Sequence, residues 1–366
     1  MNDKTNSALI AMSGGVDSSV AALLIKQQGF NCTGATMKLF SSEDIGVNRE
    51  SGCCSLADAD DARAVATGLG MPFYVFNFTA DFKNQVIGRF IEAYQNGLTP
   101  NPCIDCNRYL KFERLLNRAK QLGIDYMVTG HYSQIEHDKT GGRYLLKKGK
   151  DSSKDQSYVL YSMSQEQLKR TLFPLGGLCK SEVREIALEH GFVNAKKQDS
   201  QDICFVPKTE NLSYTDFITQ YSGKEPVKGR FIDINGKDLG EHKGIIHYTV
   251  GQRKGLGLTS ESPLYVCALN PEANSVVVGT NEHLYSRVLI ARDINLIAYE
   301  RLNSALNVRA KVRYNQPEQP ATIQQLDSDI LRIEFDEPQR AITKGQAVVI
   351  YDGEIIIGGG TITEVL

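Results

Sequence analysis

The chain has 366 residues, of which 41% are hydrophobic and 23% are charged, a profile typical of a folded globular protein. This length exceeds what one ordinary hydrophobic core organises, so we expect two or three domains. The 41 basic and 43 acidic side chains give a formal net charge of -2. Bulk charge therefore does not indicate a nucleic-acid partner, and any phosphate contact must come from local basic patches.

The first twelve residues carry no obvious targeting signal. They are polar apart from a short apolar run at residues 8–12, which is too short for a signal-peptide core or a membrane span and is not rich in arginine. We therefore expect a cytoplasmic protein with no membrane partner. Because cytoplasmic thiols stay reduced, the eight cysteines require an explanation other than a disulfide scaffold.

The first two hundred residues alternate between apolar runs and amphipathic stretches. The predicted strands are residues 8–12, 32–39, 72–78 and 126–129, and the predicted helices are 18–28, 55–69 and 108–122. This alternation indicates an α/β fold with a doubly wound parallel sheet. Ligands of such sheets bind where the strands end.

The sequence pattern changes near Pro207. Beyond it, short strand-like runs separated by glycines replace the helical periodicity. An Asp352-Gly353 pair between two apolar runs predicts a β-hairpin. We expect a catalytic domain over residues 1–206, a small mixed α/β domain over 207–284 and a C-terminal β-barrel over 285–366.

A glycine- and serine-rich loop, Ser13-Gly14-Gly15-Val16-Asp17-Ser18-Ser19, lies between the first predicted strand and helix. Glycines let the backbone approach a phosphate, hydroxyls donate hydrogen bonds, and the helix N-terminus carries partial positive charge. No Gly-Lys-Ser/Thr follows, so this is not a Walker loop. A plain strand-to-helix turn capped by Ser18 is the alternative.

The loop resembles the SGGxDS signature of the PP-loop pyrophosphatases. That resemblance implies a cradle for the pyrophosphate released when ATP adenylates a substrate oxygen. It also implies that Asp17 helps hold Mg²⁺, which suits a carboxylate beside phosphates.

Two cysteines lie in polar surroundings. Cys106 follows a proline-rich loop before a predicted helix, where a thiolate is stabilised, and Cys204 ends the polar stretch 199–204. Cys32, Cys179 and Cys267 lie in apolar contexts typical of small buried hydrophobic residues.

Structural zinc is the alternative for the Cys-x-x-Cys pair formed by Cys103 and Cys106. Such a site usually has a second Cys or His pair, which the adjacent Cys53-Cys54 does not supply. Inert thiols are a further alternative.

Several distinctive motifs together resemble the tRNA-specific 2-thiouridylases, nearly end to end and in order. They are Gly14-Gly15-Val16-Asp17-Ser18, Asn101-Pro102, Cys106-Asn107, Lys111-Phe112, Thr129-Gly130-His131-Tyr132, Lys154-Asp155-Gln156-Ser157-Tyr158, Asp199-Ser200, Ile203-Cys204-Phe205 and Gly251-Gln252-Arg253-Lys254-Gly255-Leu256-Gly257. A synthetase that adenylates a small metabolite would share only the first motif.

The resemblance implies a reaction in two stages. ATP adenylates the C2 oxygen of the wobble uridine in the tRNAs for Lys, Glu and Gln, and sulfur then displaces AMP. Cys204 would carry sulfur as a persulfide supplied by a donor protein, such as a cysteine desulfurase or a sulfur relay. Cys106 would attack the activated carbon or form the disulfide that releases the sulfur.

This chain has Cys103 where well-known bacterial members have an aspartate. Cys103, Cys106 and Cys204 could therefore ligate a [4Fe–4S] cluster with one open iron that binds hydrosulfide. The sequence leaves the persulfide and cluster routes open.

The resemblance also assigns binding residues. ATP contacts fall on Ala11, Met12, Ser13, Gly14, Gly15, Val16, Asp17, Ser18, Met37 and Gly130. Contacts with the target base or the rest of the tRNA fall on Asn101, Pro102, Cys103, His131, Lys154, Asp155, Gln156, Arg313, Tyr314 and Gln346.

Two local basic patches support tRNA binding. Arg143, Lys147, Lys148, Lys150 and Lys154 form one. Arg309, Lys311 and Arg313 alternate along a strand-like stretch and predict a cationic face. The segment 154–156 follows a Gly/Lys-rich hinge, so we expect it to order on tRNA, although an ordinary surface turn is the alternative. A non-catalytic RNA-binding protein would also fit these patches.

Overall fold

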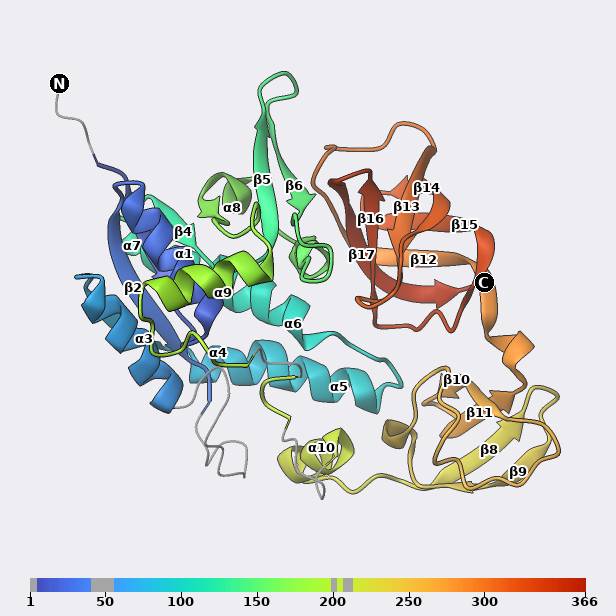
Figure 1. Cartoon of the computed structure of the whole chain (residues 1–366). Coiled ribbons are helices and arrows are strands. Elements are labelled where there is room, and N and C mark those ends of the chain that lie inside the picture. The colour runs from blue at the N-terminus through green and yellow to red at the C-terminus, as the bar shows by residue number, and fades with distance from the viewer. Residues whose placement is uncertain (1–4, 41–55, 199–202, 207–212) are drawn as a thin grey trace. The chain divides into compact units, whose positions relative to one another are not determined.

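The computed structural model describes residues 5–40, 56–198, 203–206 and 213–366. The chain divides into two compact units, which are described separately (Figure 1). Unit 1 comprises residues 1–86, 103–207 and 354–356, and unit 2 comprises residues 87–102, 208–353 and 357–366. Cys53-Cys54 and the Asp199-Ser200 motif lie outside the described residues.

Unit 1 is built on a five-stranded sheet of order β3-β2-β1-β4-β7. The strands are β1 (Ser7–Ala11), β2 (Asn31–Lys38), β3 (Phe73–Asn77), β4 (Tyr126–Val128) and β7 (Thr171–Leu172). Every pairing is parallel, which confirms the predicted doubly wound sheet. The four predicted strands differ from the observed ones by at most one residue at each end. An antiparallel hairpin, β5 (Ser133–Asp138) and β6 (Arg143–Lys148), follows β4.

The helix α1 (Val16–Gln27) follows β1 and packs against both α3 (Leu56–Gly68) and α9 (Lys180–Glu189), as Figure 1 shows. The core beneath it includes Ile10, Val20 and Val128, which are fully buried. The remaining helical elements are α4 (Thr79–Phe82), η1 (Lys83–Gly88), η3 (Ser157–Leu160) and α8 (Gln165–Lys169). These contacts fix the start of α1 at the carboxyl end of the sheet.

The helix predicted over residues 108–122 begins earlier, and this corrects the position of the cysteines. A continuous helical run comprises α6 (Pro102–Asp105), the π-helix η2 (Cys106–Leu115) and α7 (Leu116–Gln121). Proline is favoured at a first helical position because its missing N–H has no partner there. A proline-rich stretch is typical of a loop, so the sequence predicts a later helix start. Cys103 therefore occupies the first turn, and Cys106 lies one turn further on rather than at the N-terminus.

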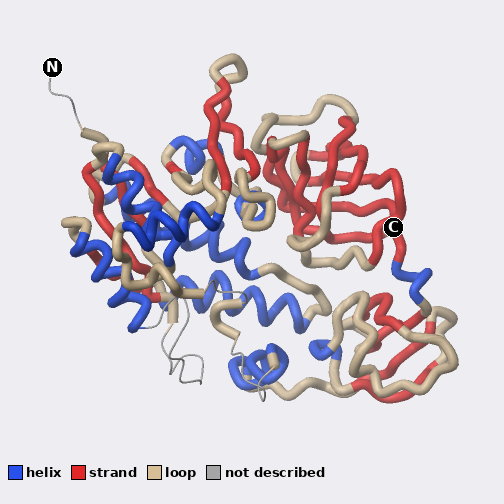
Figure 2. Tube along the Cα trace, viewed as in Figure 1, coloured by secondary structure: helices blue, strands red, loops and turns tan. Residues whose placement is uncertain are grey.

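Unit 2 contains two sheets, so strands dominate the second half of the chain in Figure 2. The first has the order β10-β11-β8-β9 around the buried Phe231 and Val276. Its strands are β8 (Gly229–Asp233), β9 (Asp238–His242), β10 (Tyr265–Asn270) and β11 (Ser275–Gly279). The unit also contains α5 (Arg89–Gln95), α10 (Tyr214–Ser222), η4 (Ile245–His247) and η5 (Asn281–Leu284).

The second sheet of unit 2 is a barrel of six antiparallel strands. Its order is β12-β15-β14-β13-β16-β17, and β12 also pairs with β17 to close it. The strands are β12 (Tyr285–Leu296), β13 (Leu306–Lys311), β14 (Gln319–Asp327), β15 (Ile330–Arg340), β16 (Ala347–Asp352) and β17 (Ile355–Val365). Gly353 turns between β16 and β17 with φ of 56°, which confirms the predicted hairpin. Within the described residues, no helix is long and apolar enough to cross a membrane.

Candidate nucleotide site and cysteine pair

The predicted phosphate loop connects β1 to α1. Gly14 has φ of +75°, and a Cβ at this position would lie 2.2 Å from the carbonyl oxygen of Asp58, so both conformation and space require glycine. The hydroxyls of Ser18 and Ser19 donate to the carbonyl of Gly15 at 3.0 and 3.2 Å. The loop thus presents hydroxyls and amides beside a helix N-terminus, an arrangement suited to phosphate.

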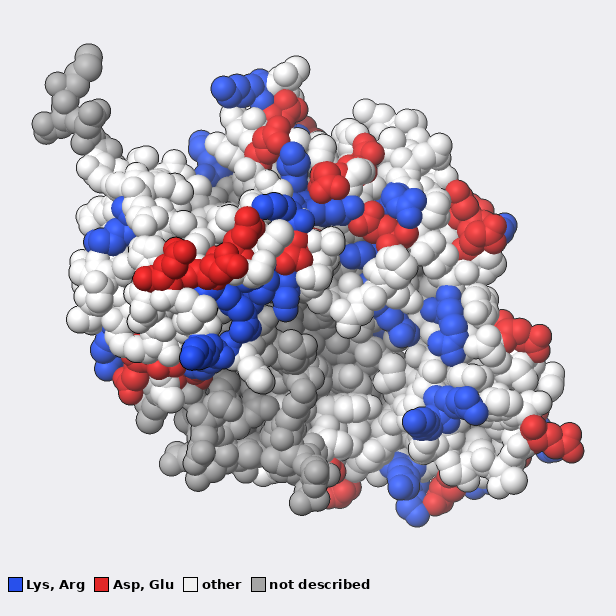
Figure 3. Space-filling model, viewed as in Figure 1, with Lys and Arg blue, Asp and Glu red and all other residues white. Residues whose placement is uncertain are grey.

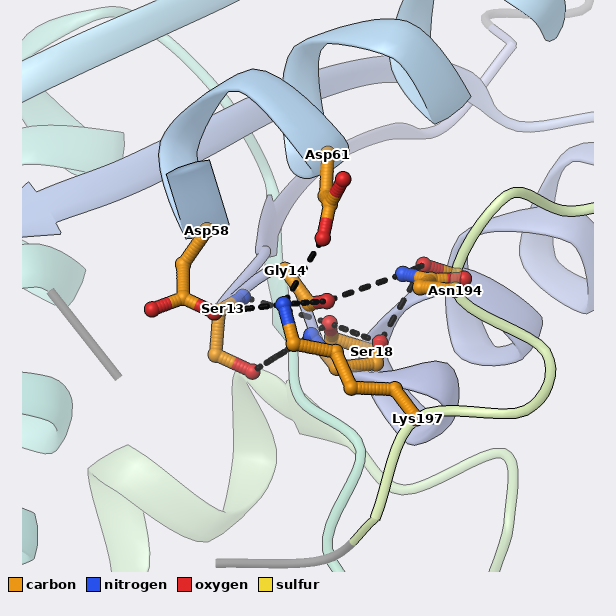
Figure 4. Close-up of polar contacts among 9 residues, drawn as sticks. Ser13, Gly14, Ser18, Asp58, Asp61, Asn194 and Lys197 are labelled. Carbon is orange, nitrogen blue, oxygen red and sulfur yellow. Dashed lines mark hydrogen bonds and ion pairs between the residues drawn. The ribbon is translucent and has the colours of Figure 1, made fainter. Parts of the chain in front are cut away.

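Two residues from the segment after α9 reach this loop (Figure 4). Asn194 Nδ2 donates to the carbonyl oxygen of Gly14 at 3.0 Å and to Ser19 Oγ at 2.9 Å. Lys197 Nζ donates to Asp58 Oδ1 at 2.5 Å, Asp61 Oδ2 at 2.7 Å and the Gly14 carbonyl at 3.3 Å. Sequence reasoning missed these contacts.

Asp17 is paired within the protein. Lys180 Nζ donates to its two carboxylate oxygens at 2.7 and 2.8 Å, and the Tyr132 hydroxyl donates to Oδ1 at 2.7 Å. Gly130 packs so closely that a Cβ there would lie 2.8 Å from the Asp17 carbonyl carbon. The structure therefore brings Asp17 and Gly130 together and adds Lys180, which sequence reasoning did not select.

Other residues expected to contact ATP lie on the neighbouring strand ends. Ala11 ends β1, and the Met12 carbonyl that follows accepts from Thr36 Oγ1 at 2.7 Å. Met37 lies near the end of β2, which runs parallel to β1. These placements agree with a ligand at the carboxyl edge of the sheet.

His131, which the sequence predicts to contact tRNA, is buried. The residue is 7% exposed and packs between the rings of Phe112 and Phe173, with centroid distances of 5.9 and 5.8 Å. Lys111 Nζ lies 3.4 Å from Nε2, and Thr129 Oγ1 lies 2.6 Å from Nδ1. Because an ammonium only donates, Nε2 accepts and Nδ1–H donates to Thr129. Burial, and then the charge of Lys111, hold the pKa of His131 well below its usual value of 6.5.

This depressed pKa predicts an acid-sensitive fold. Below about pH 6.5 the unfolded chain binds a proton on this imidazole that the folded protein does not, so stability falls as pH falls towards the folded-state pKa. We expect a loss of at most about 1.4 kcal/mol per pH unit from this group. Urea unfolding at pH 7.5 and 5.5 should show His131→Gln losing less stability on acidification than the wild-type protein. An equal loss in both proteins would contradict this account.

The segment with Lys154, Asp155 and Gln156 is held in place by its own hydrogen bonds. Gln156 Oε1 accepts from the Tyr132 amide at 3.0 Å, and the Gln156 amide donates to the Tyr132 carbonyl at 2.9 Å. Asp155 Oδ1 accepts from the Gly149 amide at 3.0 Å. These contacts link the segment through Tyr132 to Asp17.

The basic patches are partly neutralised by acidic neighbours. Lys147 pairs with Glu136 at 2.9 Å, and Lys150 pairs with Glu182 at 3.1 Å. On the face drawn in Figure 3, basic and acidic side chains are interspersed over much of the surface.

In unit 2 the predicted alternation holds along β13 but ends before Arg313. Val308 and Ala310 point into the barrel, whereas Arg309 is exposed and Lys311 is half-buried. Arg313 lies beyond the strand, where Nη2 donates to the Ala341 carbonyl at 2.7 Å and to Thr343 Oγ1 at 3.0 Å. Arg313 thus hydrogen-bonds to a loop of its own unit, a role that the alternating basic pattern of residues 309–313 did not predict.

The remaining residues expected to contact tRNA are also placed. Tyr314 is 38% exposed, and the Gln346 carbonyl accepts from the Ile362 amide at 2.8 Å. The loop before Asn101 and Pro102 packs on the barrel, where the Thr99 amide donates to the Lys344 carbonyl at 3.0 Å.

Cys103 is exposed, and Cys106 and Cys204 are half-buried. Cys204 precedes Phe205, whose buried ring packs edge-on against Phe82 at 5.6 Å between centroids. Among the residues described, no three or more His, Cys, Asp or Glu side chains are placed to hold a metal ion. This arrangement of the three thiols does not fit a shared cluster.

The remaining cysteines of the described part of the chain are Cys32, Cys179 and Cys267. Cys32 is buried, as expected, and burial raises the pKa of its thiol despite the nearby Lys26 charge. Cys179 and Cys267 are half-buried, and burial also raises the pKa of the Cys267 thiol. Only Cys32 therefore matches the predicted buried state fully.

A parallel sheet that carries a glycine- and serine-rich loop at the end of its central strand defines an α/β nucleotide-binding protein. Family models place the chain more narrowly. The model for the tRNA methyl transferase HUP domain matches residues 6–208, the tRNA methyl transferase PRC-barrel domain matches 215–280, and the aminomethyltransferase beta-barrel domain matches 286–362.

Two full-length relatives agree with this assignment. The chain is 51% identical over 366 residues to the tRNA-specific 2-thiouridylase MnmA of Clostridioides difficile (strain 630), covering 100% of this chain and 99% of that protein. It is 50% identical over 360 residues to the tRNA-specific 2-thiouridylase MnmA 1 of Thermoanaerobacter sp. (strain X514), covering 98% of each. A solved 4-thiouridine synthetase–RNA complex with bound ATP is 20% identical, with a TM-score of 0.37, covering 60% of this chain and 50% of that one. The chain belongs to the tRNA-specific 2-thiouridylase family, which confirms the resemblance of its motifs.

Proposed function

We propose that the chain is a tRNA-uridine 2-sulfurtransferase, which uses ATP to thiolate C2 of the wobble uridine. The observation that carries this proposal is the full-length identity of about half to relatives named as tRNA-specific 2-thiouridylases. The geometry supports it because a phosphate loop, Cys106 and Cys204 belong to the same compact unit. A synthetase acting on a small metabolite would need the loop but neither cysteine.

In the proposed reaction the phosphate loop binds ATP by its pyrophosphate end. Asp17 lies in the first turn of α1 and would hold Mg²⁺ together with the phosphates, since Mg²⁺ usually takes one or two carboxylates and substrate oxygens. The ion would neutralise charge on the departing pyrophosphate. Lys180 Nζ, which lies 2.7 Å from Asp17 Oδ1, would hold this carboxylate in place and contribute positive charge near the anionic substrate.

Sulfur transfer is proposed to use two thiols. A sulfur-donor protein would load Cys204 as a persulfide. The Cys106 thiolate would then attack the inner sulfur of that persulfide, which forms the Cys106–Cys204 disulfide and releases hydrosulfide to attack the activated carbon. A thiol reductant would restore both thiols for the next turnover. AMP leaves with the former C2 oxygen. Because the three thiols do not form a metal site among the described residues, we derive no step through a cluster.

The proposal extends to tRNA contacts by Asn101, Pro102, Lys154, Tyr314 and Gln346, and to the tRNAs for Lys, Glu and Gln as acceptors. The direct experiment incubates the purified chain with ATP and an unmodified transcript of one of these tRNAs. Pyrophosphate release should require both. Release with ATP alone, or with a small metabolite in place of tRNA, would overturn the proposal in favour of a metabolite synthetase. A chain that binds tRNA but never releases pyrophosphate would be a binding protein only.

Substitutions of two cationic residues at or just beyond the end of β13 should have different effects on tRNA binding and on stability. Lys311 is half-buried, with Nζ 5.6 Å from the centroid of the Tyr351 ring, whereas Arg313 binds groups of its own unit. If Lys311 contacts a phosphate, Lys311→Ala should flatten the salt dependence of tRNA affinity by about one unit of slope without changing the unfolding temperature. Arg313→Ala should instead lower the unfolding temperature. Filter binding across a salt series and thermal unfolding measure both, and an unchanged slope for Lys311→Ala would contradict the predicted phosphate contact.

A further inference from the structure

Asn194 and Lys197 both bind a single peptide unit of the phosphate loop. The carbonyl oxygen of Gly14 accepts from Asn194 Nδ2 at 3.0 Å and from Lys197 Nζ at 3.3 Å. The contacts join positions 180 and 183 residues apart in the chain. Neither residue has a role in the motifs that identify the family.

Because a peptide unit is planar, holding its carbonyl also fixes the direction of its amide N–H. The Gly14–Gly15 peptide is trans, so its C=O and its N–H point in opposite directions. With the carbonyl held by Asn194 and Lys197, the Gly15 N–H points to Ser13 Oγ at 3.4 Å. Ser18 Oγ lies 3.4 Å from the same hydroxyl, so the amide faces the hydroxyl side of the loop.

This peptide would otherwise rotate easily. It is flanked by two glycines, which accept most backbone conformations. A rotated peptide would direct the carbonyl towards the hydroxyl side and would repel an incoming phosphate. Asn194 is 2% exposed and its Oδ1 has no hydrogen-bond partner, so its amide is fixed by the two bonds that Nδ2 donates.

Lys197 also places a positive charge beside the phosphate loop. Its three N–H groups are used by Asp58, Asp61 and Gly14, which leaves none for direct donation to a phosphate. Burial would lower its pKa, but hydrogen bonds and charges from Asp58 and Asp61 raise it overall. The ammonium therefore stays charged and offsets one of two carboxylates that would otherwise face an anionic ligand.

We propose that Asn194 and Lys197 are positioning residues that hold the Gly14–Gly15 peptide in the orientation that binds the pyrophosphate part of ATP. The inference rests on the proposed function, because it assigns these residues to the same ATP site. It predicts a specific loss: contacts to phosphate weaken, whereas contacts to the nucleoside remain. A general loss of structure would weaken both.

The test measures the affinities of inorganic pyrophosphate, ATP and adenosine for the full chain by calorimetry. Lys197→Met and Asn194→Asp should each weaken binding of pyrophosphate and ATP about tenfold or more, because each removes a hydrogen bond and adds uncompensated negative charge. Adenosine affinity should stay within about twofold. Lys196→Met is the matched control, since Lys196 is exposed and adjacent in sequence, and it should bind all three like the wild-type chain.

Each outcome of these binding measurements either supports or overturns the positioning role of Asn194 and Lys197. Unchanged pyrophosphate affinity in both variants would overturn the proposal, as would an equal loss of adenosine affinity or an equal effect of Lys196→Met. Asn194→Asp changes almost no volume, so it decides the question if Lys197→Met does not fold. A wild-type chain that binds neither ATP nor pyrophosphate would overturn the proposed function instead.

Discussion

Replacing Asp17 by asparagine should lower tRNA-dependent pyrophosphate release by roughly 10²–10³-fold, the range for removing one preorganised charge from a reaction centre. Asp17 is the acidic side chain in the first turn of α1 and belongs to the loop at residues 13–19. In the proposed reaction it holds Mg²⁺ on the leaving pyrophosphate, and a neutral amide is a much weaker ligand for that ion. A radiometric pyrophosphate assay with saturating tRNA measures the effect.

The structure adds a complication that the sequence did not predict. Asp17 is also the partner of Lys180, whose side chain is only 10% exposed, so removing the carboxylate leaves a buried ammonium unpaired. We expect a stability loss of roughly 2 kcal/mol, less than for a fully buried pair because Asp17 remains partly exposed. Sequence reasoning alone would have expected an intact fold.

A double variant separates the two effects. Asp17→Asn with Lys180→Met removes both charges, so its unfolding temperature should recover towards the wild-type value while pyrophosphate release stays low. Wild-type rates in the single variant would end the assignment of Asp17 to the reaction. Recovery of activity in the double variant would show that the charge balance, and not the carboxylate, was required.

The sheet could be predicted from sequence because its information is local. Apolar runs such as residues 8–12 and 32–39 bury both faces of parallel strands, so the runs themselves mark the strands. The loop at residues 13–19 was likewise predicted from its own composition. Its short-range pattern of glycines, serines and aspartate needs no distant partner to be recognised.

The rest of the site depends on contacts between distant segments. Lys197 meets Asp58 across 139 positions and Gly14 across 183, and its own segment has no periodicity that would mark it. His131 follows a strand end, where exposure and burial are equally consistent with the local sequence, and only packing between Phe112 and Phe173 decides it. Lys180 is the first residue of α9, and helix-capping rules account for a helix start there. The direction of its side chain towards Asp17 instead follows from the packing of α9 on α1.

Cys103 supplies the sharpest test of how sulfur moves. Cys106→Ser and Cys204→Ser should each lower thiolation by at least about 10³-fold, because a hydroxyl neither carries a persulfide nor replaces a thiolate nucleophile. Cys103→Asp should keep most activity, since Cys103 is exposed in the first turn of a helical run, where a carboxylate interacts favourably with the helix dipole. Mass spectrometry of the tRNA nucleosides, with a persulfide donor, measures all three.

Sulfur transfer through an iron–sulfur cluster would give different and measurable results. If Cys103 were one of three ligands of a cluster, a carboxylate would replace a soft thiolate that iron–sulfur sites prefer. The wild-type chain prepared without oxygen would then contain iron and sulfide, and Cys103→Asp would lose both together with sulfide-dependent activity. We expect the persulfide outcome, because the described side chains do not gather Cys103, Cys106 and Cys204 into a metal site. Iron and sulfide in stoichiometric amounts, lost in Cys103→Asp, would reverse that expectation whatever the activity with a persulfide donor.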